Sequence, residues 1–150
     1  MIFKVFTDGG SKGNPGPSSI GIVMKIGDKT VWEHHERIGI ATNNDAEYSA
    51  LIKALQILNP RFARRVKSED PNLLSQANKF QIPNIKKIQF FSDSRLMVNQ
   101  VNGLFKVKNG KIKEYILKIR VLEQEISLPI TYSYIPREEN AEADRLVNTP

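Results

Sequence analysis

Apolar residues recur with two different periods along the chain. Between residues 19 and 26 a large apolar residue falls at every second position, and Gly27-Asp28 turns the chain back into another such run at 30–40. A period of two around a tight turn is typical of antiparallel strands. Residues 111–127 instead show helical spacing, which predicts a helix with one face in the core. The apolar positions of that helix are Ile112, Tyr115, Ile116, Ile119, Leu122 and Ile126.

Along the whole chain the pattern predicts the order β, β, β, α, β, α, α, β, α. The expected strands are 1–6, 19–26, 30–40, 88–91 and 130–135, and the expected helices are 42–58, 95–102, 111–127 and 140–146. The first three strands are joined by turns and should form an antiparallel meander, whereas the later two return through helices and should pair parallel. The prediction is an α/β fold with a mixed five-stranded sheet flanked by helices.

Composition narrows the class of protein. The chain has 150 residues, 40% of them hydrophobic, which suits one compact domain. It has no cysteine, which excludes disulfide frameworks and thiolate zinc sites and favours the cytoplasm. The short N-terminal apolar run is interrupted by Lys4, so we expect no secretory signal, and no stretch is long enough to span a membrane. The net charge of +6 suits a polyanionic partner, although charge alone does not identify one.

Four acidic residues stand where strands or helices begin or end. Asp8 follows an apolar strand and precedes the glycine-rich stretch 9–17, and Asp93 ends the strand at 88–91. Glu47 lies in the first turn of one predicted helix and Asp144 lies in another. Each has a simpler interpretation, as a turn residue, a helix-dipole partner, a helix cap or a solvated acid. Their joint occurrence favours a metal site.

The segments around these acids, 6–17, 41–51, 88–94 and 134–146, resemble in order the motifs of the type 1 ribonucleases H. The resemblance covers nearly the whole chain. It implies the ribonuclease H fold and metal-dependent, endonucleolytic hydrolysis of the RNA strand of RNA/DNA hybrids, which leaves 5′-phosphate and 3′-hydroxyl ends. It also implies one ribonuclease H domain over residues 1–150, and we expect a monomer.

The resemblance assigns Asp8, Glu47, Asp93 and Asp144 as catalytic ligands of two Mg²⁺ ions, with Mn²⁺ as a substitute. Two-metal sites hold their ions about 3.5–4 Å apart and stabilise both the attacking and the leaving oxygen. By resemblance Asp8 bridges the ions, Asp144 helps hold the one that activates water, and Glu47 with Asp93 holds the other. Without metal, four converged carboxylates repel one another and raise their pKa values.

Amides and hydroxyls are expected to distinguish RNA from DNA, because the 2′-hydroxyl both donates and accepts hydrogen bonds. The resemblance assigns substrate contacts to Ser11, Gly13, Asn14, Thr42, Asn43 and Asn44. Alternatively, Asn14 serves a turn, and Thr42 or Asn43 caps the following helix. Lys106 and Lys108, in a loop resembling the variants without an extended basic protrusion, are expected to meet the DNA backbone. A solvated lysine cluster is the alternative.

Two features depart from the commonest family pattern. Arg137 stands in the loop where many members have a histidine, as in a subset of the family, and arginine cannot act as a general base near neutral pH. We expect Arg137 to hold phosphate or to assist product departure, or else to pair with Glu138 or Glu139. The second feature is a basic insertion at about 60–87, with seven basic and two acidic residues. Our hypothesis is that its arginines at 61, 64 and 65 add nucleic-acid affinity.

Two other functions compete with this hypothesis. One is a module that binds hybrids or duplexes without cutting them, which the intact acids argue against. The other is a different nuclease of the same superfamily, such as an integrase or a junction-resolving enzyme. That class shares the metal chemistry but lacks the Asp-Gly-Gly-Ser turn and the asparagine pair after a threonine.

Overall fold

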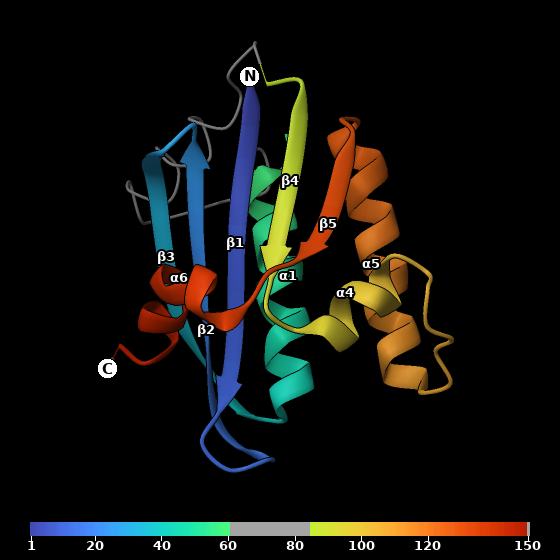
Figure 1. Ribbon diagram of the computed structural model, residues 1–150. Helices are drawn as coiled ribbons and strands as arrows, with labels where there is room; N and C mark the ends of the chain where they lie inside the picture. The colour runs from blue at the N-terminus through green and yellow to red at the C-terminus, as the bar shows by residue number, and fades with distance from the viewer. Residues whose placement is uncertain (61–84, 150) are drawn as a thin grey trace.

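The computed structural model describes residues 1–60 and 85–149 and contains a five-stranded sheet with the order β3-β2-β1-β4-β5 (Figure 1). β1 and β2 pair antiparallel, as do β2 and β3, whereas β4 pairs parallel to both β1 and β5. The mixed sheet and the order of the elements confirm the predicted α/β fold. The bounds are β1 Ile2–Ser11, β2 Gly16–Ile26, β3 Lys29–Ala41, α1 Asn43–Leu58, β4 Lys87–Ser92, α4 Arg95–Val101, α5 Gly110–Ile126, β5 Ile130–Tyr134, the 3₁₀ helix η1 Arg137–Asn140 and α6 Ala141–Val147.

Helices cover both faces of the sheet. α1 packs on β1 and β2 and contacts α5 on one face, and α6 packs on β1 and β2 from the other, in front of the sheet in Figure 1. The larger core fills the space between the sheet and α1, and includes Phe3, Met24 and Tyr48. The smaller core lies under α6 and includes Val23 and Leu146. Met24 and Val23 thus serve opposite faces, as the period of two along β2 requires.

β1 is longer than the sequence indicates. The expected strand ended before Asp8, but β1 continues to Ser11 because β2 pairs with it as far as Ser11 opposite Ser18. Its parallel pairing with β4 stops earlier, at Thr7 opposite Ser92. Asp8 therefore lies inside an antiparallel pair but just past the end of the parallel one, where the sheet opens toward Asp93.

The start of α1 settles the choice between Thr42 and Asn43 as its cap. The Thr42 hydroxyl accepts a hydrogen bond from the Asp45 N–H at 3.0 Å, and the Asp45 carboxylate accepts one from the Thr42 N–H at 3.3 Å. This reciprocal pair is a capping box. Asp45 also accepts a hydrogen bond from Tyr115 at 2.9 Å and pairs with Lys111 at 3.1 Å, which ties α1 to α5. Asp45 therefore stabilises both the start of α1 and its packing against α5.

The predicted stripe on α5 faces the core. Ile119, Leu122 and Ile126 are buried, and Ile112, Tyr115 and Ile116 pack against the same cluster. Most of the predicted basic insertion, including residues 61, 64 and 65, lies outside the described residues. Among the helices of residues 1–60 and 85–149, none is both long and apolar enough to cross a membrane.

Candidate active site

Three carboxylates from three different elements converge at one edge of the sheet. Asp8 comes from β1, Glu47 from the first turns of α1, and Asp93 directly follows β4. One oxygen from each lies within 4.8 Å of the other two. Asp8 and Glu47 are 7% and 8% exposed, while Asp93 is half-buried. The structure thus brings together three of the four acids predicted from sequence.

Glu47 reaches this cluster because Gly9 has no side chain. A Cβ atom at Gly9 would lie 2.3 Å from the carbonyl carbon of Ala46, so any larger residue would push α1 away from β1. With glycine there, the Gly9 N–H donates a hydrogen bond to the Glu47 carboxylate. The same N–H lies 3.0 Å from the Asp8 carboxylate. One backbone donor therefore orients two of the acids.

Asp93 is free for the cluster because another residue caps α4. The Ser94 hydroxyl accepts a hydrogen bond from the Met97 N–H at 3.2 Å and is the N-cap of that helix. The alternative interpretation of Asp93 as the cap is therefore wrong. Ser92 supports the turn by accepting a hydrogen bond from the Ser94 N–H at 3.0 Å.

Asp144 approaches the other three acids from α6. Asn140 anchors the start of this helix, because its side-chain amide donates to the carbonyl of Thr7, next to Asp8, at 2.9 Å. Gly21 allows the close approach, since a Cβ atom there would lie 2.5 Å from the Ala143 carbonyl oxygen. Asp144 lines the same cleft as the three converged acids but is not part of their tight group. Its carboxylate lies 3.4 Å from the Arg137 guanidinium.

The protein keeps these acids in an environment that disfavours negative charge. Burial, with the charges of Asp93 and Asp144, raises the pKa of Asp8 from 3.8 to about 7. Burial and the neighbouring Asp8 also raise the pKa of Glu47 well above its usual value. Burial raises the pKa of Asp93 as well, and Arg137 partly opposes that shift. A bound cation would relieve this repulsion, and carboxylate oxygens are the ligands that a hard divalent ion prefers. The residues present therefore fit a divalent metal.

The acids lie in a cleft of about 1060 Å³. All four line it, together with Arg137, Ser11, Asn43 and Asn44. Thr42, Gly13 and Asn14 are not among its lining residues.

The predicted asparagines form a small network beside the cleft. The Asn14 side-chain oxygen accepts a hydrogen bond from the Asn43 N–H at 3.0 Å, and the Asn43 side-chain oxygen accepts one from the Ser11 N–H at 2.9 Å. Gly13 has a φ of 92°, which fits its place in the turn. The network holds the turn after β1 against the start of α1. Each of the two asparagines keeps its NH₂ group as a donor.

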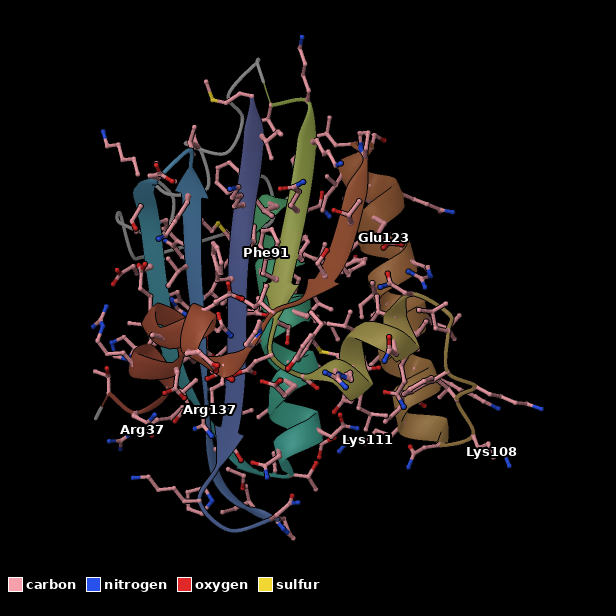
Figure 2. The ribbon with its side chains drawn as sticks, in the orientation of Figure 1. Arg37, Phe91, Lys108, Lys111, Glu123 and Arg137 are labelled. Carbon is pink, nitrogen blue, oxygen red and sulfur yellow. The ribbon has the colours of Figure 1, made fainter. Side chains whose placement is uncertain are left out.

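The two predicted lysines lie apart from the acids. Lys106 and Lys108 are exposed in the connection between α4 and α5 and do not line the cleft. Figure 2 shows Lys108 beyond α4, on the far side from Arg137. They can meet a long nucleic acid only where it extends past the cleft.

Several cleft residues escaped the sequence analysis. They are Lys12, Arg37, Leu96, Tyr134, Asn148 and Thr149. The Arg95 guanidinium lies over the ring of Tyr134, 4.6 Å from the ring centre. The sequence offered no signal for Arg37, because an exposed arginine in a polar strand is ordinary. Lys12 stood in the glycine-rich motif and could have been included.

Comparison with known proteins identifies the family of this chain. The family model described as RNase H matches residues 2–149. The chain therefore belongs to the RNase H family. It is 33% identical over 150 residues to the bifunctional protein Rv2228c of Mycobacterium tuberculosis, with 99% of this chain and 35% of that protein covered. It thus spans about a third of the length of this relative. Ribonuclease HI of Halobacterium salinarum is 31% identical, over 95% of this chain and 61% of that protein.

Solved structures agree with this assignment. LC11-RNase H1, solved in complex with an RNA/DNA hybrid and isolated from compost by a metagenomic approach, has 36% identity and a TM-score of 0.78. The alignment with it covers 97% of this chain and 94% of that chain. RNase H1 of Halobacterium salinarum has 30% identity and a TM-score of 0.76, with 99% and 96% covered.

Proposed function

We propose that the chain is a ribonuclease H that cuts the RNA strand of RNA/DNA hybrids endonucleolytically and leaves 5′-phosphate and 3′-hydroxyl ends. The observation that carries the proposal is the convergence of Asp8, Glu47 and Asp93 within 4.8 Å, in a cleft that Asp144 shares. Membership of the RNase H family and the likeness to LC11-RNase H1, a structure solved with such a hybrid, support the substrate.

The proposal includes two divalent ions, Mg²⁺ in the first place and Mn²⁺ as a substitute, held by Asp8, Glu47, Asp93 and Asp144. When bound, such ions stabilise charge on the attacking and leaving oxygens of a phosphodiester. The chain's own part is to place the acids before the ions arrive. The Gly9 N–H fixes the Glu47 carboxylate, and Asn140 fixes the start of the helix that carries Asp144.

Arg137 completes the proposed catalytic set. Its side chain is 77% exposed and lies 3.4 Å from the Asp144 carboxylate, so one side of the guanidinium still faces the cleft. Arginine stays protonated near neutral pH and cannot take a proton from water. Its proposed work is to hold a phosphate oxygen and to assist product departure. In this respect the chain would belong to the subset of the family with arginine in place of the loop histidine and without the extended basic protrusion.

Substrate recognition is proposed to use the turn after β1 and the start of α1. The residues concerned are Ser11, Gly13, Asn14, Thr42, Asn43 and Asn44. The side-chain oxygens of Asn14 and Asn43 already accept backbone hydrogen bonds, so their NH₂ groups would donate to ribose hydroxyls or base edges. Lys106 and Lys108 would meet the DNA backbone beyond the cleft. We propose one ribonuclease H domain that acts as a monomer in the cytoplasm.

The direct test compares wild type with Asp93→Asn on a labelled RNA/DNA hybrid, with Mg²⁺ and with EDTA. The substitution removes a metal ligand with little change in shape. We expect wild type to cut with Mg²⁺ alone, and Asp93→Asn to bind the hybrid without cutting it. Full cutting by the variant would reject the site, whereas binding without cutting by wild type would favour the non-catalytic module.

A further inference from the structure

Arg37 of β3 stands in the wall of the cleft, away from the carboxylates in sequence and on another strand. It lines the cleft together with Ser18, Ser19 and Gly39, and with residues 147–149 at the end of α6. Figure 2 shows Arg37 and Arg137 both below α6 in that view, with Arg137 on η1, just before the helix begins. The cleft therefore continues from the acids past α6 to an arginine.

A β-bulge shapes this part of the wall. Ser18 pairs with Gly39 and Ser19 pairs with Arg37, so Ile38 is an extra residue on β3. Gly39 has a φ of 81°, a conformation that favours glycine, and a Cβ atom there would meet nothing within 4 Å. Bulges are frequent beside active sites, where they redirect a side chain. Here the bulge lies next to Arg37, with Ile38 packed against the larger core and Gly39 lining the cleft.

Arg37 has no partner for its charge among the residues that the structure describes. Within residues 1–60 and 85–149 its guanidinium forms neither an ion pair nor a side-chain hydrogen bond. The neighbouring Glu36 is engaged by His34 at 2.9 Å and by Lys53 at 3.5 Å. By contrast, Arg137, the other arginine of the cleft, already contacts Asp144. Arg37 is thus an available planar cation on a wall that also contains Ser18, Ser19, Val147, Asn148 and Thr149 and no acidic residue.

The charge distribution of the cleft indicates what Arg37 could bind. The acids that line the cleft are the four carboxylates, and they repel a polyanion. A strand held at the acids must continue along the wall, where its next phosphates need cations. The guanidinium matches phosphate oxygens with two parallel N–H donors, which makes arginine well suited to such a contact.

We propose that Arg37 binds a backbone phosphate of the strand that is cut, on the β3 side of the phosphodiester held at the acids. This inference rests on the proposed function and adds a contact that sets how the strand lies in the cleft. Arg37 would thereby fix the register of cutting as well as contribute to affinity.

The first test measures hybrid binding as a function of salt in the Asp93→Asn background. Arg37→Gln should weaken binding about three- to tenfold and reduce the slope of log K against log salt by about 1, the value for one lost phosphate contact. Arg37→Lys should keep the slope. The control is Arg145→Gln, which removes the same charge from α6 outside the cleft and should leave the slope unchanged. Equal slopes for Asp93→Asn alone and for Asp93→Asn with Arg37→Gln would overturn the proposal.

The second test identifies the phosphate. Two sets of hybrids, one with a single uncharged methylphosphonate at successive positions of the RNA strand and one with it in the DNA strand, are cut by wild type and by Arg37→Gln. At one position of the RNA strand the losses should not add, because both changes remove the same contact. Additive losses at every RNA position, or non-additivity on the DNA strand alone, would overturn the proposal. Failure of wild type to cut any hybrid would instead reject the proposed function itself, so the two failures are distinguishable.

Discussion

The Gly9 N–H donates a hydrogen bond to the carboxylate of Glu47, a residue 38 positions further along the chain. This contact joins β1 to α1 at the candidate metal site. It exists because the backbone of α1 occupies the space where a side chain at position 9 would stand. The glycine that looks like a turn residue in the sequence is therefore a packing requirement of the site.

Gly9→Ala should damage both folding and activity. Its Cβ atom would lie 2.3 Å from the Ala46 backbone, so α1 must shift and carry Glu47 with it. We expect the free energy of unfolding to fall by about 1–3 kcal/mol, the usual cost of overpacking. Cleavage of the hybrid should fall at least about tenfold at a temperature where the variant is folded, as expected when a charge-stabilising group is displaced.

The matched control for that change is Gly110→Ala, at the start of α5. A Cβ atom there meets nothing within 4 Å, so stability and cleavage should stay at the wild-type level or rise slightly. Thermal unfolding and initial rates measure both quantities. Equal behaviour of the two variants would show that α1 does not need its close approach to β1.

The contribution of Asp8 to the stability of the metal-free protein should fall as pH rises from about 4 to above 7. The pKa of Asp8 rises from 3.8, the usual value for an aspartate, to about 7 in the folded protein. The folded state therefore binds the proton more tightly than the unfolded state. The contribution of this group is therefore most favourable below pH 3.8 and is lost as pH rises through 7. Denaturant unfolding in EDTA across this range measures the effect.

Asp8→Asn isolates that contribution, because asparagine does not titrate. The variant should show a flatter pH dependence than wild type and should be the more stable of the two at pH 8 in EDTA. Mg²⁺ should then raise the melting temperature of wild type at pH 8 more than that of the variant. A wild-type protein that gains stability from pH 5 to pH 8 without metal, relative to Asp8→Asn, would contradict the raised pKa.

Asp45→Asn should separate stability from catalysis. Asp45 completes the capping box with Thr42 and binds Tyr115 and Lys111 of α5. Burial acts to raise its pKa, but hydrogen bonds from Tyr115, Lys111 and Thr42 lower it overall, which indicates that the fold favours its charged form. We expect the free energy of unfolding to fall by about 0.5–2 kcal/mol, as for other helix caps. The rate of cleavage at saturating metal and substrate should stay nearly unchanged. A large loss of turnover in a folded variant would place Asp45 in the catalytic machinery.

Arg137→Gln should slow turnover more than it weakens binding. The guanidinium contacts Asp144 and faces the cleft, so the substitution removes a charged hydrogen-bond donor. We expect turnover to fall about tenfold or more. No ionisation should disappear from the pH–rate profile, because arginine does not titrate near neutral pH, but its acid limb should move to higher pH because Arg137 opposes the raised pKa of Asp93. Glu138→Gln, a neighbouring exposed residue that does not line the cleft, is the control. A profile that loses an ionisation near neutral pH in Arg137→Gln would contradict this role.

The sequence predicted the order of elements because local periodicity determines each element's type. It also predicted that Asp8 and Asp93 both follow strands, and the family resemblance added Glu47 and Asp144 from helices. The structure brings Asp8, Glu47 and Asp93 together, with Asp144 in the same cleft. The extension of β1 to Ser11 could not be predicted, since it depends on how far β2 pairs with it. The residues around the bulge were missed for the same reason. Gly39 inside the predicted strand at 30–40 was a signal for a bulge, since an isolated glycine in a strand often marks one, but which residues it offsets depends on the pairing with β2.

The roles of the polar residues near α1 were predicted less well than their positions. Thr42 and Asn43 both suit a helix cap, and geometry alone decides for Thr42. The side-chain oxygen of Asn43 instead accepts a hydrogen bond from the Ser11 N–H, a contact between segments distant in sequence.

Lys106 and Lys108 were proposed as contacts to the DNA backbone from their charge and their place in a loop. Charge does not determine where a loop lies in the fold, and the structure places both lysines outside the cleft.

The most direct test of the account is cleavage of one duplex sequence in four forms, as RNA/DNA, RNA/RNA, DNA/DNA and single-stranded RNA, with each strand labelled at its end. With Mg²⁺ we expect cuts in the RNA strand of the hybrid, intact DNA strands, and no cutting in EDTA. Hybrid that is bound but uncut with Mg²⁺, or cutting that persists in EDTA, would contradict a metal-dependent ribonuclease H.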